Sequence, residues 1–334
     1  MTTTPQNLPA REYWTEEPFR GRIREVSLPE PGPGEVLVET EVSGISPGTE
    51  TLVHRGEVPE SVAGLMRAPQ QLGELPFPVS HGYLNVGVVR RGPAELLGRR
   101  VFTLSGHRSH LTVPAAACHL VDEDIPAERA LLAGVAEVGL NAVWESQVTL
   151  ADRTAVIGGG LVGLVTALLA QRTSPARLQL VETSAVRREL AAQLGLEAVT
   201  PEEAAHHNDV VFHTSASQQG LQRALEITGD DGTVVEMSWY GDRQPQVPLG
   251  ADFHARRLRL VGSQVGEVAA PKRLRRSRSQ RLAAALGLLD ERFDALVTGS
   301  SPLAKLPEVM NDFAGAAEWT RSQLLHVVTY KGED

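Results

Sequence analysis

The sequence predicts an α/β protein in which a β-rich N-terminal half precedes a doubly wound parallel sheet. Three observations support this prediction. Residues 11–125 contain short apolar strands separated by turns, residues after about 127 alternate between helix and strand patterns, and a glycine-rich turn at residues 158–163 joins an apolar strand to an apolar helix. Alternating strands and helices are typical of βαβ units, which build parallel sheets.

The N-terminal half has the turn chemistry of a small β structure. The alternating run 35–42 follows Pro31-Gly32-Pro33-Gly34, which is a strong turn signal. The predicted strands are residues 35–42, 86–89, 100–104 and, returning from the C-terminus, 325–330. We therefore expect an all-β barrel or sandwich, with domain boundaries at 1–125 plus 296–334 and at 126–295.

The second half has the rhythm of a doubly wound sheet. Predicted strands are residues 154–157, 178–181, 209–213, 233–237 and 258–261, and predicted helices are residues 128–143, 161–172, 185–194, 218–227 and 282–289. Gly195 and Gly229 follow two of these helices, as expected for helix ends. Successive right-handed crossovers would place the strands in one parallel sheet.

The turn Gly158-Gly159-Gly160-Leu161-Val162-Gly163 predicts a dinucleotide site, because a strand precedes it and a helix follows it. Gly158 would make the tight turn, Gly160 would let the backbone approach a pyrophosphate, and Gly163 would pack helix against strand. The amides of Leu161 and Val162 would then face the anion. The alternative is a glycine-rich turn beside an empty groove.

Glu182 ends the next predicted strand, about 20 residues further on. Its carboxylate would accept hydrogen bonds from the adenosine ribose and repel a 2′-phosphate, so we expect NAD(H) to be preferred. Arg187 keeps NADP(H) as the alternative, because an arginine can accommodate that phosphate. Thr214 and Ser238 follow later strands and are expected near the nicotinamide end of the cofactor.

Composition excludes several classes of function. A formal net charge of -9 and a pI near 5.6 argue against nucleic acid as the main partner. Residues 1–10 lack the apolar core of a signal peptide and no apolar run has the length of a membrane span, so we expect a cytoplasmic protein without a membrane partner. Cys118 is the one cysteine, which excludes an internal disulfide and a thiolate-rich zinc site.

The arginine-rich run 272–281 leaves two interpretations open, a solvated helix start and a contact with an anionic ligand or an acidic neighbouring subunit.

Several motifs together resemble the medium-chain dehydrogenase/reductase family over nearly the whole chain. They are residues 31–38, the segment Ser43-Gly44-Ile45-Ser46-Pro47-Gly48-Thr49-Glu50, the glycine fingerprint and residues 186–191. Residues 43–50 and 140–144 look like its zinc-type alcohol dehydrogenase branch, to which bacteriochlorophyllide-type dehydrogenases are related. The resemblance implies a GroES-like domain, a Rossmann domain and an active site between them.

The sequence departs from the family at its metal ligands. Ser46 stands where the family has a cysteine, while Tyr83 and Leu84 replace its histidine and glutamate. These side chains cannot hold Zn²⁺ tightly at neutral pH, so we expect a zinc-independent protein. A shifted site that uses His81 and Glu50 is the alternative.

Without zinc, hydride transfer needs another group that stabilises charge on the substrate oxygen. Candidates are Ser46, Thr49, His81 and Tyr83, and each could instead have a structural role. We expect an oxidoreductase, assembled as a homodimer, that acts on an alcohol/ketone pair of a small molecule. The rivals are reduction of an activated C=C bond and a non-catalytic dinucleotide-binding sensor or scaffold.

Overall fold

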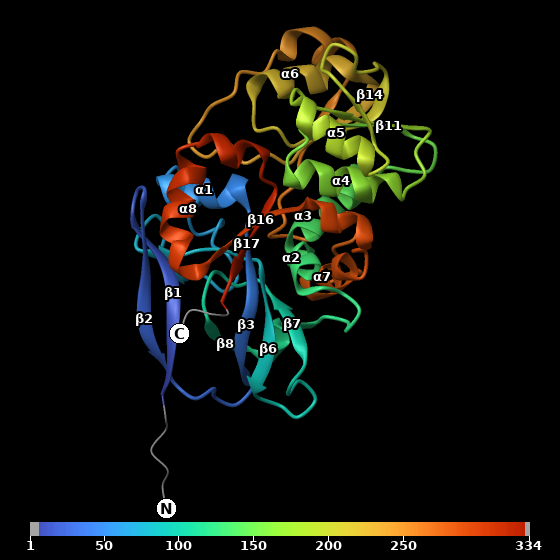
Figure 1. The fold of residues 1–334 in the computed structure, drawn as a ribbon. Coiled ribbons are helices and arrows are strands. Elements are labelled where there is room, and N and C mark those ends of the chain that lie inside the picture. Colours follow the sequence, from blue (N-terminus) through green and yellow to red (C-terminus); the bar gives the residue numbers. More distant parts are fainter. Residues whose placement is uncertain (1–6, 331–334) are drawn as a thin grey trace, which may run out of the picture. The chain divides into compact units, whose positions relative to one another are not determined.

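The computed structural model describes residues 7–330 and divides into two compact units, which are considered separately (Figure 1). The first unit contains the chain up to Gly134 and from Leu296 onward, and the second is Val135–Ala295. Most of the polar N-terminal stretch predicted to lack a signal sequence, residues 1–6, lies outside the described residues. No helix within the described residues is long and apolar enough to cross a membrane.

The first unit contains two sheets. A seven-stranded sheet has the order β16-β17-β3-β6-β7-β9 with β8 paired to β3, and a four-stranded sheet has the order β2-β1-β5-β4. The strands are β1 (Leu8–Glu17), β2 (Arg20–Leu28), β3 (Glu35–Ile45), β4 (Leu72–Gly73), β5 (Val79–Ser80), β6 (Asn85–Arg91), β7 (Arg100–Thr103), β8 (His110–Pro114), β9 (His119–Leu120), β16 (Val297–Pro302) and β17 (Leu325–Thr329).

The C-terminal strand returns to the N-terminal half, as predicted. β17 runs antiparallel to β3 with His326 opposite Ile45, which places a C-terminal strand beside a strand of the N-terminal half (Figure 1). Most residues of β3 are buried, including the consecutive Val36, Leu37 and Val38, so both faces of the strand are covered within this unit.

The all-β expectation for this half was wrong in one respect, because the first unit also contains α-helices. Helix α1 (Pro47–Arg55) follows β3 directly, and α8 (Leu306–Ala314) packs beside it, with α2 (Ala127–Leu131) near the unit's boundary. Pro47 occupies the first turn of α1 and Gly56 closes it with a φ of 76°. Both are ordinary helix end signals that the strand-rich surroundings obscured.

The second unit is a six-stranded parallel sheet of order β12-β11-β10-β13-β14-β15, which confirms the predicted fold class. Its strands are β10 (Arg153–Ile157), β11 (Arg177–Val181), β12 (Glu197–Val199), β13 (Asn208–His213), β14 (Thr228–Glu236) and β15 (Arg259–Gly262). Its helices are α3 (Ala133–Ser146), α4 (Leu161–Gln171), α5 (Ala185–Gln193), α6 (Gln218–Ile227) and α7 (Arg278–Leu286).

The strand order explains where a ligand site can form. β11 and β13 flank the central β10 on opposite sides, so the chain reverses its winding direction there. In open α/β sheets such a switch point leaves a crevice beyond the carboxyl ends of the strands. The loops after Ile157, Val181 and His213 converge at that edge.

Candidate functional site

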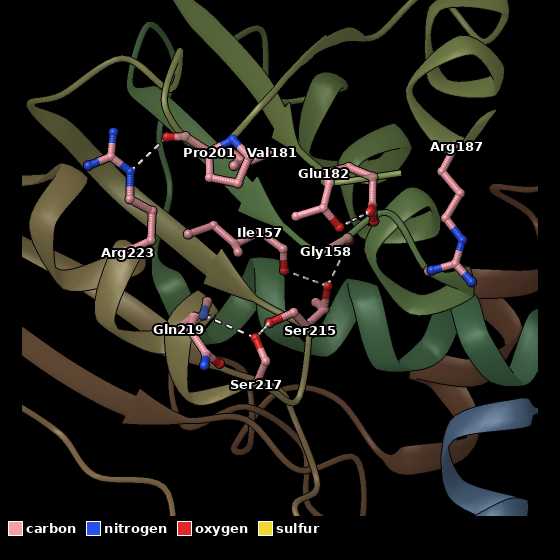
Figure 2. A pocket seen from close by; sticks show the side chains of 14 residues that line it. Ile157, Gly158, Val181, Glu182, Arg187, Pro201, Ser215, Ser217, Gln219 and Arg223 are labelled. Atoms are coloured by element: carbon pink, nitrogen blue, oxygen red, sulfur yellow. Dashed lines mark hydrogen bonds between the residues drawn. The ribbon is translucent and has the colours of Figure 1, made fainter. Parts of the chain in front are cut away.

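A cavity of about 380 Å³ lies at the switch point of the second unit (Figure 2). Apolar walls come from Ile157, Val181 and Pro201, and polar groups surround them. The polar and glycine lining comprises Gly158, Gly160, Glu182, Thr183, Arg187, Thr214, Ser215, Ser217, Gln219, Gly220 and Arg223. Apolar walls beside polar groups have the chemistry that a nucleoside needs.

The glycines of the fingerprint leave open backbone on one side of this pocket. Gly158 has a φ of 105°, a conformation that favours glycine, and a side chain at Gly163 would begin 1.8 Å from the Gly158 carbonyl oxygen. A Cβ at Gly160 would meet only Arg187 Nη1, at 4.0 Å. Gly160 caps α4 without a side-chain hydrogen bond, so the helix N-terminus is open to an anion, as a pyrophosphate requires.

Glu182 lies at the end of β11 with its carboxylate against the glycine turn. It accepts hydrogen bonds from the Gly159 N–H at 2.6 Å, the Ser184 N–H at 2.7 Å and the Thr183 hydroxyl at 3.1 Å. A carboxylate has about four acceptor positions, so about one remains for a ribose hydroxyl. The fold therefore uses Glu182 to hold the turn as well as to line the pocket.

The other predicted cofactor residues are distributed over this region. Thr214 lines the pocket and its hydroxyl donates to the Ile157 and Gly158 carbonyls, at 2.9 and 3.0 Å. Leu161 and Val162 form the first turn of α4, outside the pocket lining. Ser238 is also outside that lining, and its hydroxyl accepts the Ala216 N–H at 3.0 Å.

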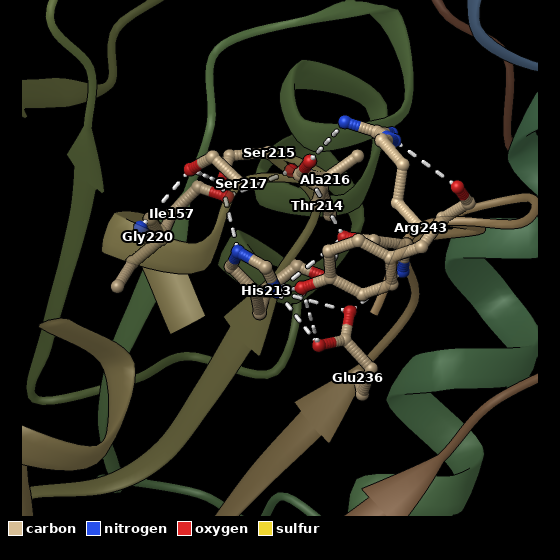
Figure 3. A network of polar contacts seen from close by, with 11 residues as sticks. Ile157, His213, Thr214, Ser215, Ala216, Ser217, Gly220, Glu236 and Arg243 are labelled. Atoms are coloured by element: carbon tan, nitrogen blue, oxygen red, sulfur yellow. Dashed lines mark hydrogen bonds and ion pairs between the residues drawn. The ribbon is translucent and has the colours of Figure 1, made fainter. Parts of the chain in front are cut away.

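Sequence reasoning missed a buried network beside the pocket (Figure 3). His213, the last residue of β13, is fully buried and lies between Glu236 at the end of β14 and Ser215. Its Nδ1 is 2.9 Å from both Glu236 carboxylate oxygens, and its Nε2 is 2.7 Å from Ser215 Oγ. The available signal was a histidine and a glutamate ending two strands of one parallel sheet, whose carboxyl ends share an edge.

In the first unit, the structure brings Tyr83, Ser46 and Thr49 together. The Tyr83 hydroxyl donates to Ser46 Oγ at 2.7 Å, and the Thr49 side chain also forms a hydrogen bond with the phenol. Burial raises the pKa of Tyr83, an effect that these hydrogen bonds reduce and the nearby Glu50 carboxylate reinforces. The phenol consequently stays protonated at neutral pH and is able to donate a proton.

Two residues outside the predicted catalytic set support this hydroxyl cluster. Glu50 accepts the Ser46 N–H at 2.8 Å through one oxygen and contacts His107 Nε2 at 2.8 Å through the other. His107 Nδ1 is 2.7 Å from Ser43 Oγ, and that hydroxyl is 2.7 Å from the Tyr330 hydroxyl. These contacts join α1, β3, the loop between β7 and β8, and the residue that follows β17, so groups distant in sequence support the cluster.

His81 lies beside Tyr83, with ring centroids 6.2 Å apart, but no direct hydrogen bond joins them among the described contacts. Its Nδ1 is 2.9 Å from Gln71 Oε1, while Nε2 is buried and finds no hydrogen-bond partner within the described part of the chain. Burial lowers the pKa of His81 to about 4. The ring is therefore neutral near pH 7, with a lone pair on a buried nitrogen.

The donor set at the positions of the expected metal ligands does not suit Zn²⁺. The Ser46 and Tyr83 hydroxyl groups are hydrogen-bonded to each other. Leu84 is an apolar core residue, 1% exposed, and has no atom that can bind a metal. The alternative ligand Glu50 already uses both oxygens. Over residues 7–330, no group of three or more His, Cys, Asp or Glu side chains is arranged to hold a metal ion.

The arginine-rich run separates into exposed and buried members. Arg275, Arg276 and Arg278 are exposed, but Arg281 is 1% exposed. Its guanidinium donates to Glu137 at 3.0 Å, to Asn141 at 2.6 Å and to backbone carbonyls. Both predicted interpretations of the run missed this role, which is to attach α7 to α3.

No family model matches the chain. The sequence is 26% identical to 2-dehydro-3-deoxy-L-galactonate 5-dehydrogenase of Pseudoalteromonas atlantica over 50% of this chain, and the chain spans about half (51%) of that relative's length. It is 25% identical to sorbitol dehydrogenase of Homo sapiens, with 68% of this chain and 74% of that protein covered.

Solved structures of low sequence identity share the fold. L-idonate 5-dehydrogenase from Escherichia coli has a TM-score of 0.79 at 15% identity, covering 98% of this chain and 100% of that one. 2R,3R-butanediol dehydrogenase from Bacillus subtilis has a TM-score of 0.76 at 19% identity, covering 96% and 99%. The solved structures show the fold, and the sequence relatives are dehydrogenases, which agrees with the predicted resemblance to the medium-chain dehydrogenase/reductase family.

Proposed function

We propose that this protein is a zinc-independent, NAD(H)-preferring oxidoreductase that interconverts an alcohol and a ketone of a small polyhydroxylated molecule. The observation that carries the proposal is the Tyr83–Ser46 hydroxyl pair, which stands where a metal would otherwise stabilise the substrate oxygen. The sequence relatives that act on sorbitol and on a dehydro-deoxy sugar acid support a polyol-like substrate.

The pocket of the second unit supports a dinucleotide as the cofactor. Gly160 leaves room for a pyrophosphate at the N-terminus of α4, and the apolar lining that includes Val181 and Pro201 suits an adenine ring. When bound, the nicotinamide supplies or takes up the hydride. Glu182 places negative charge where a 2′-phosphate would lie, which favours NAD(H), while Arg187 in the same lining tempers that preference.

In the reducing direction, hydride adds to the carbonyl carbon and the oxygen takes a proton from the Tyr83–Ser46 pair, which gives the alcohol. Tyr83 holds that proton because burial raises its pKa. Ser46 positions the phenol, Glu50 holds Ser46 by accepting its backbone N–H, and His107 contacts the other oxygen of Glu50. Reduction leaves the pair without this proton, and in the oxidising direction the deprotonated pair accepts the proton of the alcohol.

Zinc independence follows from the donor chemistry at Ser46, Tyr83 and Leu84. Hydroxyl oxygens and an apolar side chain do not provide the thiolate, imidazole or carboxylate ligands that zinc prefers. Preorganised hydroxyl donors can stabilise charge on an oxygen without a metal.

A substrate survey tests the proposal. Purified protein is assayed with NADH against polyol-derived ketones and, separately, against enones and quinones, with a reaction lacking substrate as the control. Turnover confined to the ketones supports the proposal, whereas turnover confined to enones or quinones would assign C=C reduction instead. Binding of NADH without turnover on any substrate would indicate a sensor or scaffold.

A further inference from the structure

We propose that Glu236 and His213 are positioning residues that fix the direction of the Ser215 and Ser217 hydroxyl groups, so that this wall of the pocket accepts hydrogen bonds from an unphosphorylated adenosine. The inference rests on the proposed function in one respect, that the pocket holds a dinucleotide. It adds a second determinant of cofactor choice to Glu182.

The network has a fixed geometry (Figure 3). His213 is fully buried, and its ring stacks on Tyr240 with centroids 6.4 Å apart. Ser215 Oγ is 2.7 Å from His213 Nε2 and 2.9 Å from Ser217 Oγ. A Cβ at Gly220 would lie 2.2 Å from Ser215 Oγ and 2.9 Å from His213 Nε2, so neighbouring backbone confines both groups.

The hydrogen atoms along this chain can be assigned in order. A carboxylate only accepts, so His213 Nδ1 carries the proton that bonds to Glu236, and in the neutral ring Nε2 must accept. Ser215 therefore donates to Nε2 and accepts from Ser217. Ser217 in turn accepts the Gly220 N–H at 3.0 Å.

The Ser215 and Ser217 oxygens consequently present lone pairs to the pocket, because their hydroxyl protons are used within the network. Ser215 and Ser217 both line the cavity that contains Glu182, as Figure 2 shows. Ribose hydroxyls and the adenine amino group can donate to these oxygens. A 2′-phosphate dianion only accepts, so it gains nothing from this wall, and its adenosine is bound less well.

Glu236→Gln should reverse the direction of the hydrogen bonds that run from residue 236 through His213 to Ser215, with little change in the shape of the side chain. The Ser238 N–H donates to Glu236 Oε1 at 2.8 Å and should hold the amide oxygen there, which leaves the amide NH₂ in the place of Oε2. That NH₂ can donate to His213 Nδ1, the ring proton then moves to Nε2, and Ser215 becomes free to donate into the pocket. A phosphate oxygen could accept that proton.

The test is fluorescence titration of NADH and NADPH into purified protein at pH 8. The readout is the ratio of the NADPH and NADH dissociation constants. We expect Glu236→Gln and Ser215→Ala each to lower this ratio about three- to tenfold, the value of one hydrogen bond. Tyr240→Phe is the matched control, because it removes a hydroxyl that lies 3.3 Å from Glu236 Oε2 and 3.5 Å from His213 Nδ1 and keeps the stacked ring. The Glu236 carboxylate still accepts from Nδ1 in this variant, so the ratio should not change.

The titration distinguishes a failure of the positioning role from a failure of the proposed function. If the unaltered protein binds both dinucleotides and neither Glu236→Gln nor Ser215→Ala changes the ratio, the positioning role is wrong. If the unaltered protein binds neither dinucleotide, the proposed function fails. Ser215→Ala keeps the test valid if Glu236→Gln does not fold, since it leaves the His213–Glu236 pair in place.

Discussion

The dinucleotide pocket of the second unit and the hydroxyl cluster of the first are constructed by different means. Backbone dominates the pocket, where close approach requires glycine at Gly158 and Gly163 and where Gly160 leaves the backbone open within the same short segment. Side chains dominate the cluster, where Glu50 contacts His107 across 57 residues and Ser43 contacts Tyr330 across 287. A site built from local backbone leaves a sequence signature, whereas one built from distant side chains does not.

Because the two sites are built differently, we expect that a substitution in the hydroxyl cluster can lower turnover without changing dinucleotide binding, and that a substitution in the pocket can abolish binding. Tyr83→Phe should lower turnover roughly 10²–10⁴-fold, the usual range for a lost general acid, because it removes only the hydroxyl. NADH affinity and thermal stability should barely change, since the ring keeps its packing. Steady-state kinetics together with NADH titration measure both quantities, and unchanged turnover would exclude Tyr83 as the donor.

The reciprocal change is Gly160→Val. The new side chain has open space in the cofactor-free protein, with Arg187 Nη1 as the nearest contact at 4.0 Å, so the variant should fold. It fills the space of a pyrophosphate, and we expect binding of both NADH and NADPH to fall at least about 100-fold, because backbone approach at this glycine is what the fingerprint provides. Wild-type affinity in a fluorescence titration would mean that the dinucleotide does not lie on this turn.

The second unit also contains a buried ion pair that the sequence pattern concealed. Arg281→Ala leaves the Glu137 carboxylate, 4% exposed, without its partner and should destabilise the unit by about 3–5 kcal/mol in a denaturant titration. Replacing both residues together, as Glu137→Leu with Arg281→Met, should recover much of that loss. An exposed arginine of the same run, Arg276, is the control, and Arg276→Ala should have little effect.

The smallest expected effect is a pH dependence that arises from His81. Its pKa is lowered to about 4 in the folded chain against an ordinary value near 6.5, so the unfolded chain binds the proton first as the pH falls. The His81 side chain should lower the free energy of unfolding by at most about 3 kcal/mol as the pH falls from 6.5 to 4. Above pH 6.5 it should have no effect.

Thermal unfolding measured between pH 7.5 and pH 4.5 should therefore show a shallower slope for His81→Gln than for the unaltered protein. His54 and His110 also have a pKa lowered by burial, so a residual slope of the same sign should remain. Identical slopes for the two proteins would show that His81 is not the group responsible.

The sequence predicted the fold class well, because it depends on local periodicity and on glycines with a fixed spacing. It also nominated Ser46, Thr49 and Tyr83, which the structure places in one hydrogen-bonded cluster. It could not identify the Glu236–His213–Ser215 network or Arg281, since these contacts form only when separate strands or helices meet. Helix α1 was missed although Pro47 and Gly56 are visible helix end signals.

The measurement that tests the central claim most directly is the zinc content of active protein, combined with its response to a chelator. Purified protein is analysed for bound metal, dialysed against a strong chelator, and assayed for NADH-dependent ketone reduction before and after. Because Ser46, Tyr83 and Leu84 provide no zinc ligands, the account predicts less than stoichiometric zinc and unchanged turnover. One tightly held zinc per chain, with turnover that is lost on chelation and restored by added Zn²⁺, would contradict it.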